Sequence, residues 1–520
     1  MLTKNTKKIF AVTCILFFAV LFTKIYAIFC PSLLGQIDLS IDEAQYIFWS
    51  KNLEMGYFSK PPLIAWMLAF LSQYCGESYQ CLRSLQSVAF LFASIFCGAS
   101  TFVITKDFKI SCLSGFLFFT LPLSTFYSQF ATTDAWLILF WSAATFFFLK
   151  AIKNGSFFWL LCCAGVAGLG LLTKYSMIFF CISALFILQR LNKFSWSQIF
   201  IVSCTTFFVF SPNIFWNIAN EFPTLKHHVE MTSLDKGVEI HIFPLIEFFL
   251  GQLIIFSPLI FFVFFTSLVK KWRLLFFQWS HLNFEKTLLN IKQVWFLTAS
   301  FSLPIFATMM FLSLISETEI NWASPISIPI VIYFCTLVSK AKKVNVISKE
   351  ITPVVPLTLI INISFFVFFV NSPKFFYSLS SEDTSKYNPF RQVEGYKDLS
   401  TRIESLDIGA GKIIASNDRG LLATLSLYLP NYKVRSLNSE GVHNHWDLKY
   451  RLSEMEKKEG VLLALLINND KKTLKNTVKK LKEKFALVKI ISLEKEGDLH
   501  IQGNRNKKVL LVWVSKEDVV

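Results

Sequence analysis

Two adjacent carboxylates and a lysine share one short segment near the N-terminus, IDEAQYIFWSKNLEMGYFSKPPLIAW at residues 41–66. They are Asp42, Glu43 and Lys60, and aromatic residues surround them. A carboxylate beside a hydroxyl group can accept its proton, and a lysine can stabilise negative charge that develops on a reacting oxygen. Because the segment follows the first apolar stretch of the chain, we expect this chemistry to take place at a membrane surface.

Further polar and ionisable residues flank the later apolar stretches. They are Asp134, Lys174, His227, His228, Glu317, Glu319, Asn321 and Trp322. The predicted topology places all of them on the same side of the membrane as Asp42. Ionisable groups at membrane depth are costly and are usually paired or functional, so we expect a shared acidic and basic cavity at the outer leaflet.

Each of these residues also has a purely structural explanation. Asp42 would be favoured in the first turn of a helix by the helix dipole, and Asp134, which follows two threonines, would suit a helix start. Glu43 could simply be solvated. Lys60 and Lys174 could anchor their segments by snorkelling to the membrane interface. Position alone therefore leaves the function open.

The elements that must position these residues are membrane helices. Hydrophobic residues make up 53% of the 520-residue chain, and 58 residues are phenylalanine, which is well above ordinary usage. Stretches near the roughly 20 apolar residues needed to cross a bilayer begin at about residues 9, 84, 111, 131, 157, 175, 198, 245, 294, 322 and 353. We therefore expect an α-helical polytopic membrane protein with about eleven transmembrane helices.

The basic residues indicate the orientation, because lysine and arginine are retained on the cytoplasmic side during insertion. With the N-terminus in the cytoplasm, alternate loops are rich in basic residues and the other loops are mainly acidic. An odd number of spans then places the C-terminus in the periplasm. The net charge of +16 reflects this topology, and no nucleic-acid-binding motif is present. Cys75 and Cys81 fall on the oxidising side, where they could pair or remain two reduced thiols.

A change in composition near residue 371 divides the chain. Residues 1–371 form the predicted membrane domain, whose first periplasmic loop covers about residues 31–83. Residues 372–520 are rich in charge and contain a helical pattern at 472–485. Four apolar runs predict strands, at residues 412–415, 460–466, 487–491 and 509–514. We expect a small periplasmic α/β domain that serves as a cap or a docking module, since it shows no phosphate-binding loop or nucleophile motif.

The segment after the first apolar stretch has two structural interpretations. If residues 40–54 are helical, Asp42, Tyr46 and Trp49 share one face. Alternatively, the segment lies along the membrane interface, with its aromatic residues and Tyr57 at headgroup level. Either arrangement would hold a carboxylate beside a lipid headgroup.

Five motifs occur in order along the chain, namely DEAQYIFWSKNLEMGYFSKPPLIAW, YSQFATTDAWLILFW, GLGLLTKYS, SPNIFWNIANEFPTLKHH and ETEINWASP. Together they resemble the bacterial GT-C membrane glycosyltransferases, more narrowly the glycosyltransferase family 39-like group of protein O-mannosyltransferases and the lipid A aminoarabinose transferase. The resemblance covers about residues 38–340. It implies a GT-C fold and the transfer of a sugar from a polyprenyl-phosphate carrier at the outer face, with inversion at the anomeric carbon.

The resemblance implies roles for three acidic residues. Asp42 matches the catalytic aspartate of the family's first loop and would act as general base towards a hydroxyl acceptor. Asp134 matches the second acidic position and would orient the acceptor or share that role, and Glu43 matches a recurrent position. If the acceptor were an ionised phosphate of lipid A, no base would be needed, and Asp42 would position or tune the site.

Cations suit the other half of the reaction, because breaking a sugar–phosphate bond releases an anion. Lys60 matches the lysine before the proline of the first loop, and Lys174 and His227 match recurrent positions, so all three are candidates for binding the donor phosphate. The candidate substrate-pocket residues are Tyr46, Tyr57, Glu319, Asn321 and Trp322. Whether a divalent metal binds stays an open question, because Ser59 stands where the aminoarabinose transferase has a glutamate that helps to bind a metal.

We therefore expect a glycosyltransferase of the bacterial inner membrane that modifies lipid A, lipopolysaccharide core or another envelope glycan. A protein O-mannosyltransferase is an alternative within the family. A flippase or transporter for polyprenyl-linked sugars is the alternative outside it, since it would handle the same lipid. Transporters usually show internal repeats, and none is visible in this sequence.

Overall fold

The computed structural model describes most of the chain and divides it into two compact units. The described residues are 4–30, 33–34, 37–76, 78–231, 240–276, 289–316, 318–343, 354–378, 393, 395–406, 412–438, 440–468, 470–491 and 507–516. The first unit consists of Met1–Phe29, Lys60–Ile64 and Tyr74–Val370. The second consists of Cys30–Ser59, Ala65–Gln73 and Asn371–Val520, so most of the predicted first loop folds with the C-terminal part of the chain. The functional division that we place at residue 371 stays a prediction.

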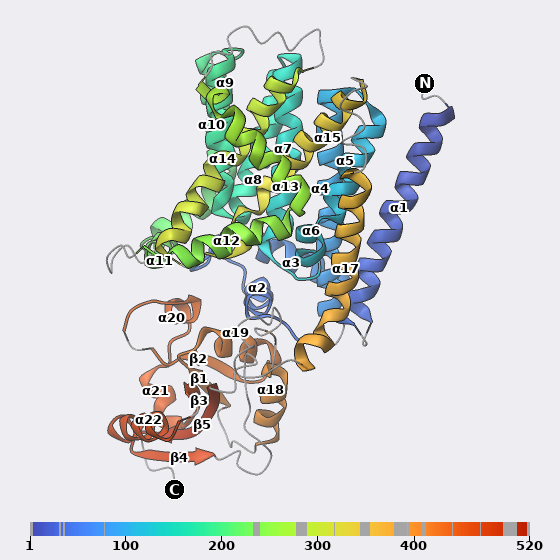
Figure 1. Ribbon diagram of the computed structural model, residues 1–520. Coiled ribbons are helices and arrows are strands. Elements are labelled where there is room, and N and C mark those ends of the chain that lie inside the picture. The colour runs from blue at the N-terminus through green and yellow to red at the C-terminus, as the bar shows by residue number, and fades with distance from the viewer. Residues whose placement is uncertain are drawn as a thin grey trace. The chain divides into compact units, whose positions relative to one another are not determined.

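The first unit is a bundle of helices (Figure 1). In chain order, its helices up to residue 219 are α1 (Lys4–Phe29), α4 (Tyr79–Thr105), α5 (Phe108–Thr120), α6 (Pro122–Tyr127), α7 (Thr133–Asn154), α8 (Phe157–Thr173), α9 (Ile178–Leu191) and α10 (Trp196–Ala219). Those that follow are α11 (Pro223–Met231), α12 (Ile242–Ile255), α13 (Pro258–Lys271), α14 (Ile291–Ile315), α15 (Ser327–Lys343) and α17 (Val354–Ser378). Three short 3₁₀ helices are η2 (Tyr175–Met177), η4 (Trp272–Phe276) and η5 (Ile320–Ile326). Helix α3 (Leu63–Cys75) contributes to both units.

Each predicted apolar stretch corresponds to a helix. In the described part of the chain, seven helical segments are long and apolar enough to cross a membrane, and they belong to α1, α4, α7, α10, α14, α15 and α17. Helices α12 and α13 would make an eighth span as a pair that bends by 118°. The bend lies at Ser257, whose φ is 68°, and Pro258, which cannot continue the preceding helix. Helices α5, α8 and α9 are shorter, so the number of eleven spans stays a prediction.

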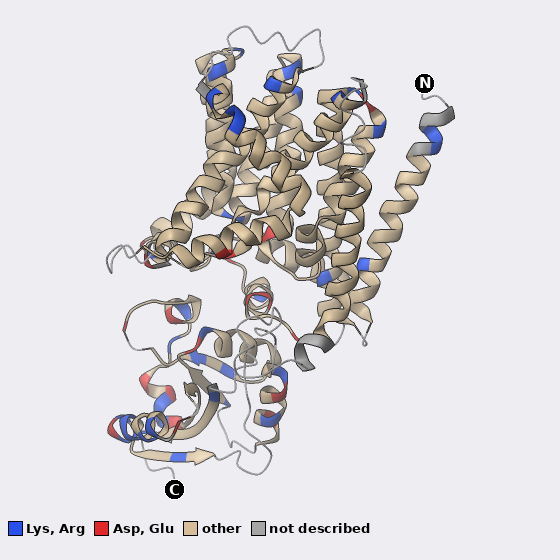
Figure 2. Cartoon of the chain, in the orientation of Figure 1, with Lys and Arg blue, Asp and Glu red and all other residues tan. Residues whose placement is uncertain are grey.

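Small residues let neighbouring helices of the bundle approach closely. A Cβ atom added to Gly98 of α4 would lie 2.8 Å from the Ser111 carbonyl oxygen of α5, and one added to Gly115 would lie 2.9 Å from the Ser94 carbonyl oxygen. Such contacts are typical of helix packing in membranes. Figure 2 shows that Lys and Arg concentrate near the helix ends of this unit. A disulfide joins Cys75, the last residue of α3, to Cys81 in the first turn of α4, so the structure favours the paired alternative for these thiols.

The C-terminal part of the second unit is built on a five-stranded sheet with the strand order β2-β1-β3-β5-β4. Its strands are β1 (Ile413–Ser416), β2 (Lys433–Ser436), β3 (Val461–Asn468), β4 (Leu487–Ile491) and β5 (Lys507–Ser515). Strand β1 is parallel to β2 and β3, and β5 is antiparallel to β3 and β4. The four predicted strands are confirmed. Strand β2 was not predicted, because its sequence KVRS is short and half of it is charged.

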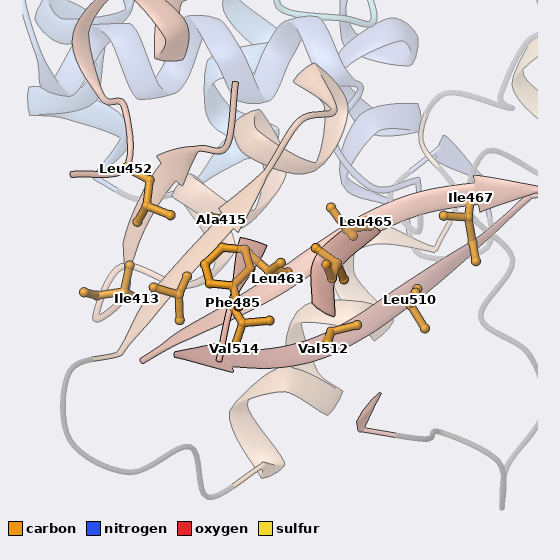
Figure 3. Packing of buried hydrophobic residues seen from close by; sticks show 12 residues of the cluster. Ile413, Ala415, Leu452, Leu463, Leu465, Ile467, Phe485, Leu510, Val512 and Val514 are labelled. Atoms are coloured by element: carbon orange, nitrogen blue, oxygen red, sulfur yellow. The ribbon is translucent and has the colours of Figure 1, made fainter. Parts of the chain in front are cut away.

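Helices cover this sheet and complete its core. They are α18 (Tyr396–Ser405), α19 (Arg419–Tyr428), α20 (His445–Lys449), α21 (Glu454–Glu459) and α22 (Lys471–Lys484). Figure 3 shows the apolar side chains of β1, β3 and β5 packed with Phe485, which follows α22. Leu481 of α22 belongs to the same cluster, while the lysines of this helix at 472, 475, 479, 480, 482 and 484 are exposed. The predicted helix at 472–485 is therefore confirmed as an amphipathic helix on a sheet.

Candidate functional site

Asp134 is the centre of a buried polar cluster in the first unit. It lies in the first turn of α7 with only 3% of its surface exposed. Its Oδ1 atom accepts a hydrogen bond from Lys174 Nζ at 2.9 Å and one from Ser324 Oγ at 3.2 Å. Its Oδ2 atom accepts a third from Asn321 Nδ2 at 2.9 Å. A buried charge is tolerated only when it is paired and hydrogen-bonded, and the Asp134 carboxylate meets both conditions.

Three different elements bring the cluster together. Helix α7 begins at Thr133, and α8 ends at Thr173, so that Lys174 stands in an extended conformation directly after it. Asn321 and Ser324 are three residues apart in η5 and therefore share one face of a 3₁₀ helix. Gln252 Nε2 of α12 donates a hydrogen bond of 3.0 Å to the Ile320 carbonyl oxygen, which holds η5 in place.

A second group of polar residues surrounds His228 of α11. Burial is the main factor that lowers the pKa of His228 to about 4, and the charges of Lys60, His227 and Lys174 lower it further. His228 is therefore neutral near pH 7. The three predicted phosphate-binding residues all contribute to this shift. Positive charge from lysines near one site favours an anion.

Tyr175 links this group to an apolar cavity. Its hydroxyl donates a hydrogen bond of 2.9 Å to Asn213 Oδ1, and its ring meets the His228 ring edge-to-face at 5.5 Å. Tyr175 also lines a cavity of about 400 Å³ between α8, α9 and α10. The other walls are almost entirely apolar, with Ala167, Phe180 and Phe210 among them. Tyr175 therefore connects His228 with the apolar cavity within one unit.

Helix α2 (Ile41–Lys51) carries the other predicted acidic residues, in the second unit. Ser40 and Glu43 form a capping box, in which the Glu43 carboxylate accepts the Ser40 N–H at 3.0 Å and Ser40 Oγ accepts the Glu43 N–H at 3.3 Å. Glu43 is fully buried. The interpretation of Glu43 as a solvated residue is therefore wrong. The capping box gives this carboxylate a structural task, and its catalytic role stays a prediction.

Asp42 has the opposite environment from its neighbour, since 47% of its side chain is exposed. Its Oδ1 accepts a hydrogen bond of 2.8 Å from Nη1 of Arg419, the first residue of α19. The same Nη1 atom lies 3.3 Å from Gln45 Oε1. Partial desolvation of the half-exposed Arg419 guanidinium group would lower its pKa, but the charge and hydrogen bond of Asp42 outweigh this effect and raise the pKa. The predicted base is thus held by a cation from a distant part of the sequence.

The aromatic residues of the first loop are buried in the second unit. Tyr46 is 2% exposed, and Trp49 and Tyr57 are fully buried. The Trp49 and Tyr57 rings stack with centroids 4.3 Å apart, and the Tyr57 hydroxyl donates to backbone carbonyls of Trp49 and Asn52 at 3.1 Å. Their burial contradicts the alternative that places these three rings at headgroup level. A substrate-pocket role for Tyr46 and Tyr57 stays a prediction.

Comparisons with known proteins agree with these features. Residues 59–216 match the family described as dolichyl-phosphate-mannose-protein mannosyltransferase. The overall structure is similar to ArnT from Cupriavidus metallidurans, with a TM-score of 0.57 over 96% of this chain and 97% of that one, at 12% identity. The chain has a GT-C fold. The predicted fold class and the predicted resemblance are confirmed.

The chain is also similar to two curated relatives and to a second ArnT structure. The chain is 28% identical over 234 residues to the lipid A galacturonosyltransferase RgtD of Rhizobium johnstonii, covering 43% of this chain. It is 25% identical over 204 residues, 38% of this chain, to the lipopolysaccharide core galacturonosyltransferase RgtB of the same organism. It spans 48% and 41% of the lengths of these relatives. ArnT bound to undecaprenyl phosphate matches with a TM-score of 0.56 at 13% identity, over 96% of this chain and 97% of that one.

The structure brings together some of the residues predicted for this GT-C site. Asn321 joins Asp134 and Lys174, and Lys60 and His227 act on His228. Glu319 is exposed at the start of η5, and the backbone N–H of Trp322 donates to its carbonyl oxygen at 3.0 Å. The pocket roles of Glu319 and Trp322 stay predictions, as does the convergence of all these groups with Asp42. Glu317 lies outside the described residues.

Sequence reasoning missed Asn213 and Ser324 in the two groups of the first unit, and it missed Arg419 beside Asp42 in the second. Ser324 had a usable signal, since it lies three residues after Asn321 within the motif ETEINWASP. Arg419 had none, because 377 residues separate it from Asp42. In the described part of the chain, no group of three His, Cys, Asp or Glu side chains is arranged to hold a metal ion.

His445 of α20 is a buried imidazole in the second unit. It is 1% exposed, and both ring nitrogens are without a hydrogen-bond partner among the described residues. The nearest carboxylate oxygen belongs to Glu54, 3.9 Å from Nε2, and Glu54 pairs instead with Lys449 at 3.2 Å. Burial, followed by the charge of Lys449, lowers the pKa of His445 to about 3.

His445 is expected to make the second unit less stable in acid. Unfolded histidine titrates near pH 6.5, so the unfolded chain binds this proton more readily. The contribution of neutral His445 to the free energy of unfolding is fully present above pH 6.5 and is lost as the pH falls towards 3. At pH 4.5 the loss is about 2–3 kcal/mol. Thermal unfolding of the full-length protein in detergent at pH 7.5 and 4.5, followed by near-ultraviolet circular dichroism, measures this loss. In His445→Phe the pH dependence should be clearly smaller, and an unchanged dependence would refute the assignment.

Proposed function

We propose that the protein is a glycosyltransferase of the bacterial inner membrane, with its N-terminus in the cytoplasm and its reactive groups in the periplasm. It transfers a sugar from a polyprenyl-phosphate donor to lipid A, lipopolysaccharide core or another envelope glycan, with inversion. The GT-C fold and the names of the relatives support this class of reaction. The observation that carries the proposal is the buried cluster in which Asp134 holds Lys174 and Asn321, next to Tyr175, which lines an apolar cavity.

The cationic group is suited to the leaving phosphate. As the bond between the anomeric carbon and the phosphate oxygen breaks, negative charge grows on the phosphate, and cations already in place stabilise it without reorganising. Asp134 accepts three hydrogen bonds, one of them from Lys174. We assign to it the task of holding Lys174 and Asn321 towards the site.

The apolar cavity is suited to an isoprenoid chain. Its walls from α8, α9 and α10 offer almost no polar atoms, and Tyr175 connects it with His228. Burial of apolar chain surface contributes roughly 25 cal/mol per Å², so even a few isoprene units would anchor the donor. The phosphate at the end of the chain would then reach the lysines.

Asp42 is the proposed general base towards a hydroxyl acceptor. Nearly half of its side chain is exposed, so an acceptor can reach it, whereas the carboxylates of Glu43 and Asp134 are buried and engaged. The acceptor oxygen forms a bond with the anomeric carbon as Asp42 takes up its proton, and the polyprenyl phosphate leaves. With an ionised phosphate as acceptor, Asp42 would position it instead.

Mass spectrometry of lipid A, core oligosaccharide and other envelope glycans tests the proposal. Cells without the protein and cells that produce it should differ by the mass of one sugar on one acceptor. The mass of the increment identifies the sugar class, and fragmentation identifies the acceptor. Identical glycans in both strains under inducing conditions would contradict the transferase and favour a flippase or transporter.

A further inference from the structure

Arg419 holds the carboxylate on which the proposed transfer depends. Its Nη1 atom donates to Asp42 Oδ1 at 2.8 Å and lies 3.3 Å from Gln45 Oε1. Asp42 and Gln45 are three residues apart on α2 and therefore neighbours on its surface. One guanidinium group thus bridges two side chains of the same helical turn, which limits the rotamers available to Asp42.

The position of Arg419 is itself determined by packing. Asp418 caps α19 by accepting the Leu421 N–H at 2.9 Å, so Arg419 is the first residue of the helix. Gly420 lies against α2 so closely that an added Cβ atom would be 2.9 Å from the Ile41 side chain. The Leu39 N–H donates to the Tyr428 hydroxyl at 3.2 Å, at the other end of α19. Helices α2 and α19 are therefore joined by contacts that do not involve the arginine.

The exposure of the ion pair argues against a role in stability alone. The side chains of Arg419 and Asp42 are 46% and 47% exposed, and ion pairs as exposed as this contribute little to stability. Arg435 and Glu456 form a pair of equal length, 2.8 Å, that is only 24% and 16% exposed. The Arg435–Glu456 pair serves as a control, because neither of its residues is bonded to Asp42.

We propose that Arg419 is a positioning residue for sugar transfer, which orients the Asp42 carboxylate and stabilises its negative charge. This inference rests on the proposed function. It makes the C-terminal part of the chain a contributor to the chemistry, beyond the capping or docking task that its sequence suggests. Besides Asp42, the charged and titratable groups that act on Arg419 are Tyr46 of α2 and Asp418, the cap of α19.

The experiment compares purified full-length variants in detergent, supplied with total membrane lipids of cells that lack the protein as the source of donor and acceptor. Transfer is measured by mass spectrometry from pH 4 to 8. Arg419→Met should slow transfer at pH 7 by about tenfold to a hundredfold, because a small misplacement of a catalytic group is costly. The acidic limb of the pH–rate profile should move up by roughly one pH unit, because loss of the cation disfavours the carboxylate.

Three further variants separate positioning from structure. Arg419→Lys keeps the charge but not the planar fork, so it should restore the acidic limb and only part of the rate. In an Asp42→Asn background, Arg419→Met should cause no further loss, because both residues act in one unit. Arg435→Met should leave the rate and the pH profile unchanged.

The outcomes distinguish this inference from the function on which it rests. If the intact protein transfers no sugar, the proposed function fails. If the intact protein is active and Arg419→Met stays within about twofold of it at every pH, the positioning role is refuted. The role is also refuted if the rate falls only in proportion to folded protein, as judged by circular dichroism, and Arg419→Lys does not restore the acidic limb.

Discussion

Asp42→Asn is expected to reduce sugar transfer to a small residual rate while the protein remains folded at normal membrane abundance. Asparagine has nearly the same shape but cannot take up a proton, and a positioned general base typically contributes a factor of about 10²–10⁴ in rate. The loss of the ion pair with Arg419 should change stability little, because the pair is about half exposed. Mass spectrometry of lipid A and core oligosaccharide from cells with equal amounts of each protein measures the effect.

The control for Asp42→Asn is Glu440→Gln, which neutralises an exposed carboxylate of the same unit. It should transfer sugar at the normal rate. An undiminished increment on a hydroxyl group in the Asp42→Asn strain would refute the general-base assignment. An undiminished increment on a phosphate group would reassign Asp42 to positioning, since an ionised acceptor needs no base.

Lys174→Met is expected to abolish transfer and also to destabilise the first unit. Lys174 and Asp134 are 12% and 4% exposed and 2.9 Å apart, so removing the lysine leaves a buried carboxylate without its counter-charge. Breaking such a pair costs about 3–5 kcal/mol. We expect the lower end, because Asn321 and Ser324 still donate hydrogen bonds to Asp134. Thermal unfolding in detergent and the sugar increment measure the two effects separately.

The double variant Asp134→Asn with Lys174→Met separates folding from chemistry. It removes both charges, and replacing both partners of a buried pair is often nearly neutral. We therefore expect it to recover most of the lost stability but not the transfer, because the phosphate loses its cation. Recovery of transfer together with stability would show that the pair serves only the structure.

Residues close together in sequence were predicted better than residues brought together by folding. The helical pattern of residues 472–485 appears as α22, and the four apolar runs appear as strands, because these elements depend on local periodicity. Glu43 was ambiguous, although Ser40 three residues earlier is the partner of a capping box. Lys60, Lys174 and His227 belong to the motifs of the resemblance, and their phosphate-binding role stays a prediction.

The sequence by itself determined that this is a membrane protein with a charged C-terminal part, and it identified the residue types able to bind phosphate and accept a proton. Apolar runs and basic loops carry that information locally. Only the tertiary structure decided which partners these residues have. Asp134 accepts hydrogen bonds from Asn321 and Ser324, which are 187 and 190 positions away in the sequence. Asp42 accepts one from Arg419. Contacts of this kind depend on packing between distant elements, which no local pattern encodes.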